Sequence, residues 1–422
     1  MKNINIKIKF LHTLLIFLLA LIFFNPFNIS KYIIVFLSMY IFLQMLNIKR
    51  LNMVLTNIQL WWLLLFCILY VTLQINYQFM DIRTGLRYLL YPLFFYVFGI
   101  VIVAKLNNEK QIVYYLYAVI IGLSLFGVFA VLYSNKIYGT AAGLEMRVAT
   151  IPWLQDVKLA GTGIGMYVCL GISLSGLLFI KTNVSIKALN ALIFIFSLYS
   201  SISLANRMGL IIALLSVILI YFVQMRLNSI RNNLKIAFYF ISQCMLLFLL
   251  FNWNVFNVKM MWLQSNAFER FASMDLFNDP RVTAWGEAFR GLFTNLLGGK
   301  QAQLSLGYAH NLWLDVGWST GLFPFIILVV FTLMTLKDYI KLLRNDDLSL
   351  YFKYLITAML CGFILTFMVE PILEANIFLF SAFCFVSGVI GSINKKHIKQ
   401  NLHIKGFKKE EGVMGNKFNA TT

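Results

Sequence analysis

Charged side chains are scarce in this sequence. Of its 422 residues, only 12% are charged and 60% are hydrophobic. Soluble domains typically carry about 25% charged residues, because a surface in water has to be polar. With so few polar residues to cover it, an aqueous fold around a single core is excluded. Lipid must therefore be the solvent for most of the side chains.

Cysteine motifs and nucleotide-binding motifs are also lacking. The five cysteines all fall inside apolar runs, and none has the CxxC or Cys/His spacing of a zinc site. We therefore expect small packing residues, without a disulfide or a metal centre. No Walker or GxGxxG motif occurs, and no nucleic-acid recognition motif accompanies the net charge of +19. We expect no cofactor and no nucleic-acid partner.

Long apolar runs are what the sequence has in plenty. A membrane-spanning helix needs about 20 mostly apolar residues. The expected spans are 10–24, 32–46, 58–73, 88–104, 112–133, 161–180, 188–205, 208–225, 235–251, 311–336, 351–369 and 375–393. The first is expected to be a retained span, because no small-residue cleavage site follows it. The predicted fold is an all-α polytopic membrane protein with about twelve transmembrane helices.

The distribution of lysine and arginine supports this count. With the amino terminus in the cytoplasm, the inside loops and the tail hold most of the 35 basic residues, and the outside loops are nearly neutral. This is the positive-inside rule, which a missed or invented span would scramble. The net charge of +19 is therefore explained by topology, with both termini cytoplasmic.

The same pattern divides the chain into four parts. Residues 1–250 would form helices one to nine, and residues 251–309 a large external loop. Residues 310–393 would form helices ten to twelve, and residues 394–422 a basic cytoplasmic tail. A second external loop, at 134–160, is also too long for a simple turn. Long loops between packed elements usually carry function.

A short amphipathic helix is predicted inside the large loop. Asp279 is a favourable N-cap, and Pro280 suits the first helical position. Gly298 and Gly299 would end the helix. The apolar residues between them share one helical face and are Val282, Trp285, Phe289, Leu292, Phe293 and Leu296. Such a helix would lie on the membrane surface or cap the bundle.

His310 is the one histidine on the external side, where the large loop meets the tenth span. Near neutral pH an imidazole can act as a general base or as a hydrogen-bonding partner of a substrate. The simpler alternative is an interfacial histidine that anchors the start of a helix. Asn311 and Asp315 follow it closely, and either could orient the imidazole or bind a substrate hydroxyl.

Arginines form a second group on the external side. They are Arg83, Arg87, Arg147, Arg207, Arg270, Arg281 and Arg290. Arg207 lies between two spans with almost no loop around it, where a charge is costly unless it is paired or faces a polar cavity. Arg281 opens the amphipathic helix, where backbone amides also favour anions. Such a set suits a phosphate or a diphosphate, although snorkelling to lipid headgroups would also explain Arg207.

Two acids, Asp315 and Glu370, lie nearest to membrane depth on this side. Each could orient a histidine or an arginine, and a structural ion pair is the alternative for both. The residues expected to carry catalysis are His310, Arg207 and Arg281. Those expected to bind substrate are Asn311, Asp315, Arg147, Arg290 and Glu370. No essential metal is expected, because no carboxylate cluster is present to hold one.

The segment 268–325 resembles the O-antigen ligase and polymerase superfamily of bacterial envelopes. The ligase motif of that family is a His-Asn pair, nine residues, and then Gly-x-x-(Gly/Thr/Tyr). Here His310 and Asn311 are followed by nine residues and Gly321. The last position of the motif holds Pro324, which departs from the pattern.

Further matches lie upstream of this motif. Arg281, Trp285 and the turn at Gly298 occur in the order that the family shows. The run from Asn206 to Gly209 is similar to the Ser/Asn-Arg-x-Gly step that opens a span in these proteins. The local matches cover about a quarter of the chain, and the global layout fits the rest.

The resemblance implies a metal-independent, GT-C-like glycosyltransferase on the periplasmic face of a bacterial inner membrane. It would transfer glycan from an undecaprenyl-diphosphate-linked donor to the end of a lipid-linked repeat unit, as O-antigen polymerases do in lipopolysaccharide biosynthesis. Besides the lipid bilayer, the partners so implied are a chain-length regulator and a flippase of the same pathway. An O-antigen ligase, which transfers polymer to lipid A-core, is the alternative. The run from Ala309 to Asp315 favours the polymerase.

A transporter or a flippase for lipid-linked oligosaccharides is the rival from another class. Twelve spans fit it equally well. A flippase needs ionisable residues along a cavity through mid-membrane, whereas the charges here gather on the external side. A non-catalytic scaffold, the third possibility, explains neither Arg207 nor His310.

Overall fold

The computed structural model describes residues 2–106, 108–227 and 279–395, and nearly all of this is helix. Before the longer gap the helices are α1 (Lys2–Phe24), α2 (Ser30–Met45), α3 (Ile48–Leu55), α4 (Ile58–Asn76), α5 (Ile82–Lys105), α6 (Glu109–Met146), α7 (Gly161–Ser173), α8 (Val184–Ser203) and α9 (Arg207–Leu227). After it they are α13 (Pro280–Thr294), α14 (Leu312–Thr320), α15 (Leu322–Leu343), α16 (Leu350–Val369), α17 (Ile372–Ala375) and a last helix, Ile377–Lys395. Short 3₁₀ helices lie at Pro26–Asn28 and Leu174–Phe179.

Nine helices in the described part of the chain are long and apolar enough to cross a membrane. A tenth candidate is the pair α2 and α3, which is bent by 108° at its break, and Phe10–Phe24 is a shorter apolar helix. The protein is therefore a multi-pass helical membrane protein, as the sequence predicts. The expected span 235–251, most of the expected basic tail, and Arg270 lie outside the described residues.

The predicted tenth span, 311–336, is wrong at its start. The helix breaks at Gly321, so that α14 is separate and the candidate span is Leu322–Leu343. Gly321 has a φ of 89°, and a Cβ there would lie 2.3 Å from the backbone oxygen of Leu296. Only glycine fits such a position. The break therefore lets the loop after α13 lie directly against the junction of α14 and α15.

The external loop predicted at 134–160 is also different. Helix α6 continues to Met146, with a kink at Gly139, and a hairpin of β1 (Val148–Ile151) and β2 (Leu154–Ala160) follows. The two strands are antiparallel and form the one sheet among the described residues. The all-α prediction thus holds for the spans but not for this hairpin, whose alternation is too short to have been recognised.

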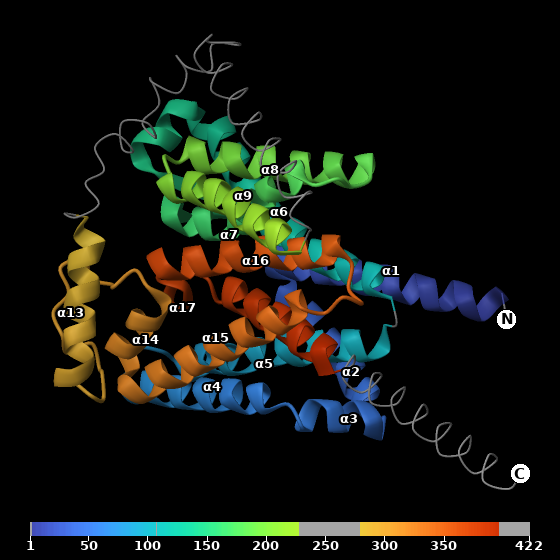
Figure 1. Ribbon diagram of the computed structural model, residues 1–422. Helices are drawn as coiled ribbons and strands as arrows, with labels where there is room; N and C mark the ends of the chain where they lie inside the picture. The colour runs from blue at the N-terminus through green and yellow to red at the C-terminus, as the bar shows by residue number, and fades with distance from the viewer. Residues whose placement is uncertain (1, 107, 228–278, 396–422) are drawn as a thin grey trace, which may run out of the picture.

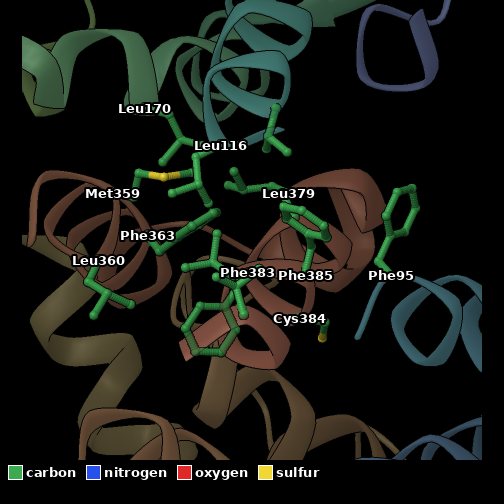
Figure 2. Packing of buried hydrophobic residues seen from close by; sticks show 14 of the residues in the cluster. Phe95, Leu116, Leu170, Met359, Leu360, Phe363, Leu379, Phe383, Cys384 and Phe385 are labelled. Carbon is green, nitrogen blue, oxygen red and sulfur yellow. The ribbon is translucent and has the colours of Figure 1, made fainter. Parts of the chain in front are cut away.

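Helix α16 and the last helix lie at the centre of the bundle, and most of their side chains are buried. Figure 2 shows Phe363 of α16 beside Phe383 of the last helix, with ring centroids 5.6 Å apart. Lipid tails are as apolar as these side chains, so close packing holds the helices together. A Cβ at Gly99 in α5 would lie only 2.4 Å from the backbone oxygen of Phe385. Small residues therefore bring α5 and the last helix into backbone contact.

Helix α13 runs across the ends of the spans, at the end of the bundle opposite the start of α1 (Figure 1). The predicted cap is present, because Oδ1 of Asp279 accepts a hydrogen bond from the backbone N–H of Arg281 at 2.9 Å. The helix ends at Thr294, and Gly298 follows it with a φ of 75°. The sequence thus predicted the existence of this helix and its start.

The face by which α13 packs was not predicted. The buried residues are Ala284, Ala288, Gly291 and Leu292. Phe289 and Phe293, on the predicted apolar face, are 52% and 61% exposed. Small side chains allow α13 to approach α14 and the loop before it closely. Phe289 and Phe293 are consequently exposed, whereas Leu292 of the same predicted face is buried.

Candidate functional site

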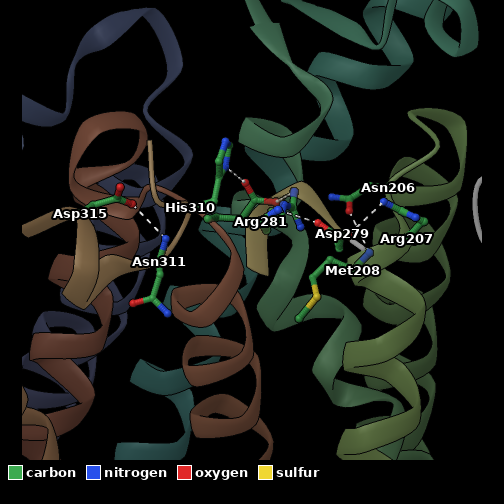
Figure 3. A network of polar contacts seen from close by, with 9 residues as sticks. Asn206, Arg207, Met208, Asp279, Arg281, His310, Asn311 and Asp315 are labelled. Atoms are coloured by element: carbon green, nitrogen blue, oxygen red, sulfur yellow. Dashed lines mark hydrogen bonds and ion pairs between the residues drawn. The ribbon is translucent and has the colours of Figure 1, made fainter. Parts of the chain in front are cut away.

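Polar side chains gather at the end of the bundle that α13 covers (Figure 3). They come from the starts of α9 and α13, the residue before β1, the loop before α14 and the end of α16. We call six of them the arginine cluster: Arg147, Arg207, Asp279, Arg281, His310 and Glu370.

Arg207 is held at the first position of α9 by a tight turn. Helix α8 ends at Ser203, and α9 begins only four residues later. Oδ1 of Asn206 accepts a hydrogen bond from the backbone N–H of Met208 at 3.0 Å, which is the bond of an N-cap. Nη2 of Arg207 lies 3.9 Å from Oδ2 of Asp279. The first turn of α9 therefore meets the N-cap of α13.

Arg281 reaches from the first turn of α13 to the end of α16. Its Nη2 lies 3.5 Å from Oε1 of Glu370. Tight charge-assisted hydrogen bonds measure about 2.7–2.9 Å. The contact of Arg281 with Glu370 is longer than this, so it is not a tight ion pair.

Glu370 is the buried centre of the cluster. It follows the last residue of α16 with an extended backbone, and its side chain is only 3% exposed. Its Oε1 faces Arg281, and its Oε2 lies 3.9 Å from Nδ1 of His310. Within the described residues, neither that Oε2 nor that Nδ1 has a hydrogen-bond partner. An unsatisfied buried polar group is costly, so a ligand that bonds to these atoms would stabilise the site.

Arg147 adds a third guanidinium group. Its backbone C=O accepts a hydrogen bond from the N–H of Gly161 at 2.6 Å, which fixes it beside the start of α7. Burial lowers the pKa of Arg147, the charges of Arg207 and Arg281 lower it further, and Glu370 raises it. Among the described residues its Nε has no hydrogen-bond partner. Three guanidinium groups against two carboxylates leave the cluster with a positive charge that favours an anion.

His310 projects from a loop that Asp315 holds in place. The φ of His310 is 52°, in the left-handed region that residues other than glycine rarely adopt. The backbone N–H groups of Ala309 and Asn311 donate to the two carboxylate oxygens of Asp315 at 2.7 and 3.0 Å. Both neighbours of His310 are therefore fixed, and its imidazole is presented to Glu370.

Asn311 also belongs to this support. Its Oδ1 accepts from the backbone N–H of Leu314 at 3.2 Å and caps α14, and its Nδ2 donates to the backbone oxygen of Met368 at 3.2 Å. Burial raises the pKa of Asp315 to about 6, although the two backbone N–H groups and His310 act to lower it. We call Asn311, Asp315 and their bonded backbone groups the cradle. Both side chains are occupied by protein groups, so the structure places them behind His310.

An apolar cavity of about 300 Å³ lies beside the arginine cluster. Its walls come from α9, α13 and α16 and include Ile211, Trp285 and Met368. The side chains of Arg207 and Arg281 also line it. Apolar walls with a few convergent charged groups are typical of a site for a small ligand. This cavity suits an amphiphile with an anionic head.

The structure thus brings most of the predicted site residues together. The arginine cluster contains His310, Arg207, Arg281, Arg147 and Glu370. Arg290 does not join them, because it lies nine residues beyond Arg281 on α13 and is exposed. Sequence reasoning missed Asp279 as a member of the site. Its only signal was its place as the N-cap residue two positions before Arg281.

Among the described residues, no group of three His, Cys, Asp or Glu side chains is placed to hold a metal ion. The four described cysteines are buried and unpaired. Comparison of the sequence with known protein families gives no match, and comparison with curated proteins gives none either. The function therefore has to be argued from the site itself.

Proposed function

We propose that this protein is a glycosyltransferase of the O-antigen polymerase type. It would take glycan from an undecaprenyl-diphosphate-linked donor and add it to a lipid-linked repeat unit on the periplasmic face of a bacterial inner membrane. The topology that goes with this proposal has about twelve spans, a periplasmic large loop and cytoplasmic termini. The observation that carries it is the arginine cluster beside an apolar cavity, with His310 at its edge.

The arginines suit the leaving group of such a reaction. When the glycosidic bond to the donor breaks, negative charge develops on the diphosphate, and donors already in place stabilise it. Arg147, Arg207 and Arg281 supply three guanidinium groups, of which Arg281 faces the buried Glu370 and Arg207 faces Asp279. One guanidinium group can donate two parallel hydrogen bonds to a phosphate. This bidentate contact orients the phosphate as well as neutralising its charge.

The apolar cavity suits the lipid part of the donor. Its walls include Ile211 and Leu365, which belong to candidate membrane spans, so it lies beside the bilayer. The first isoprene units of a polyprenyl chain could occupy it while the diphosphate meets Arg207 and Arg281. A soluble sugar phosphate has no apolar part to fill a cavity with such walls.

His310 would serve the acceptor. The acceptor oxygen forms the new bond to the anomeric carbon, the bond from that carbon to the diphosphate oxygen breaks, and the acceptor proton passes to the imidazole. Glu370 lies 3.9 Å from Nδ1 and would stabilise the resulting imidazolium. The proton then leaves to water, and undecaprenyl diphosphate is the other product.

The chemistry of an O-antigen ligase would use the same site, with lipid A-core as the acceptor. The preference for a polymerase over a ligase rests on the sequence from Ala309 to Asp315. A chain-length regulator and a flippase of the same pathway remain the proposed partners. If this chain were itself a flippase, the charged cluster at one end of the bundle would have no explanation.

The test is the lipopolysaccharide banding pattern of a strain deleted for this gene. The strain is complemented with wild type, His310→Ala or Arg207→Ala, with Arg290→Ala as the matched control. We expect deletion to leave core plus a single repeat unit, and only wild type and Arg290→Ala to restore the ladder. Bare core with accumulated lipid-linked polymer would identify a ligase instead. A full ladder from both site variants, at normal expression, would contradict the site and favour a transporter.

A further inference from the structure

A second group of side chains lies next to His310, on the side of the loop at 300–308. The ammonium group of Lys300 lies over three aromatic rings, 4.6 Å from the centroid of Phe79, 5.3 Å from Trp318 and 5.9 Å from Tyr308. Its Nζ also lies 3.4 Å from Oε1 of Glu374. We call these five residues the lysine–aromatic patch. None of them was predicted as a site residue from the sequence.

The patch is assembled from four segments and is held in place by backbone contacts. Phe79 comes from the turn between α4 and α5, Trp318 from α14, and Glu374 from α17. The N–H of Lys300 donates to the backbone oxygen of Trp318 at 3.0 Å, and the indole N–H of Trp318 donates to the backbone oxygen of Ala302 at 2.7 Å. The backbone of Lys300 and the ring of Trp318 are therefore in place before any ligand arrives.

The patch is accessible and lies beside the candidate base. Phe79 is 40% exposed and Tyr308 is 37% exposed, so their rings are open to the surroundings of the bundle end. The ring of Tyr308 lies edge-on to that of His310, with centroids 6.3 Å apart. His310 therefore lies between the two groups. It approaches Glu370 of the arginine cluster and Tyr308 of the patch.

The chemistry of the patch differs from that of the arginine cluster. The cluster has three guanidinium groups and suits an anion, whereas the patch has one ammonium group, one carboxylate and three rings. An aromatic ring offers a flat, apolar face that carries partial negative charge. A pyranose ring has an apolar face of C–H groups and a rim of hydroxyl groups. The aromatic rings of the patch can stack on such a face, and Lys300 and Glu374 can bond to the hydroxyl groups. The patch therefore suits an uncharged sugar.

We infer that the lysine–aromatic patch is the subsite for the acceptor saccharide. This inference rests on the proposed function, because it gives that reaction its second substrate. The terminal sugar would contact the rings of both Phe79 and Tyr308, and Lys300 and Glu374 would bind its hydroxyl groups. The acceptor hydroxyl would then lie within reach of His310, while the donor diphosphate stays with the arginines.

The test measures binding of a saccharide that carries neither lipid nor phosphate. The probe is the oligosaccharide released by mild acid from the surface polysaccharide of the native host. The full chain is held in lipid nanodiscs, and the dissociation constant is obtained from saturation-transfer NMR. We expect wild type to bind, and Tyr308→Ala and Phe79→Ala each to weaken binding by at least about fivefold.

The control variants separate recognition from folding. Tyr308→Phe keeps the ring and should bind within about twofold of wild type. Phe27→Ala removes an exposed ring outside the patch and should leave binding unchanged. Thermal unfolding of each variant shows whether it is folded, and Phe79→Ala, in a surface turn, carries the test if Tyr308→Ala does not fold. Saccharide binding by Phe79→Ala equal to that of wild type, or no binding by wild type, would overturn the inference.

The failure of this inference can be told apart from the failure of the proposed function. Arg281→Ala should bind the free saccharide as wild type does, because Arg281 belongs to the donor side. If the deletion strain keeps its full polysaccharide ladder, the proposed function fails whatever the saccharide binds. If the ladder is lost but both ring variants bind saccharide normally, only the placement of the acceptor subsite fails.

Discussion

The arginine cluster and the cradle share the loop of His310 and lie at the same end of the bundle, but their polar groups are satisfied to different degrees. In the cradle, Asn311 and Asp315 make hydrogen bonds of 2.7 to 3.2 Å to backbone groups. In the cluster, the ion pairs measure 3.5 to 3.9 Å. Polar atoms of Arg147, His310 and Glu370 there have no hydrogen-bond partner among the described residues.

This difference distinguishes the cradle, which holds the loop in place, from the arginine cluster, which is available to a ligand. A buried polar group with all its partners is fixed, and losing it mainly costs stability. A buried polar group without a partner lowers stability, and such groups are found where a ligand or a reaction uses them. We therefore expect substitutions in the cluster to affect activity, and substitutions in the cradle to affect stability first.

The largest effect is expected for His310→Gln. This change removes the candidate base but leaves the backbone bonds from Ala309 and Asn311 to Asp315 in place. General bases contribute about 10²–10⁴-fold to a rate, so the transfer rate should fall by that factor. The rate is measured with the purified protein and lipid-linked substrate, and the Tm should stay close to that of wild type. A variant rate within about threefold of wild type would remove His310 from the chemistry.

Arg281→Ala should have the next largest effect. Removing one preorganised donor to developing charge typically costs about 10²–10³-fold in rate. Arg290→Ala is the matched control, because Arg290 lies on the same helix and is exposed. It should retain the wild-type rate within about twofold. Equal transfer rates for Arg281→Ala and Arg290→Ala would show that Arg281 has no specific role in the reaction.

Asp315 should make stability depend on pH. Its pKa in the folded protein is raised from 3.8 to about 6, so the folded state holds the proton more tightly than the unfolded state. Its contribution is therefore complete below pH 4 and is lost as the pH rises through about 6, by an amount on the order of 3 kcal/mol. The measurement is the Tm of wild type minus that of Asp315→Asn from pH 4 to pH 7. The difference should fall across that range, and a rise would refute the assignment.

The smallest effect is expected for Asn311→Ala. Loss of an N-cap costs about 1 kcal/mol, so the Tm should drop by a few degrees. Asn311→Asp keeps an acceptor for the N–H of Leu314 and should restore most of the loss. Both Tm values are compared at the same lipid content. If Asn311→Ala keeps its Tm and loses activity, then Asn311 contacts substrate and does not belong to the cradle.

Local signals made part of this structure predictable. Asp279 and Pro280 mark the start of α13 because an N-cap and a first-turn proline act on their own helix. Arg207 and His310 could be singled out because a charge or an imidazole beside a span is rare in so apolar a chain. These features depend on few neighbours, so the sequence alone contains them.

Other features depend on contacts that the sequence does not reveal. The packed face of α13 depends on the close approach of Leu292 to Gly317 of α14 and of Gly291 to Ala302, so the sequence did not show which apolar residues of α13 would be buried. Glu370 meets His310 across sixty residues of sequence. The role of Asp315 follows from two backbone N–H groups, which every residue has and no motif records.

We propose above that the arginine cluster binds a lipid diphosphate. The most direct measurement is the binding of undecaprenyl diphosphate to the full chain in nanodiscs, followed by native mass spectrometry. Wild type and Arg290→Ala should bind equally, Arg281→Ala should bind at least about tenfold more weakly, and undecaprenol without phosphate should bind weakly to all three. Equal binding of undecaprenyl diphosphate by Arg281→Ala and wild type would contradict the account.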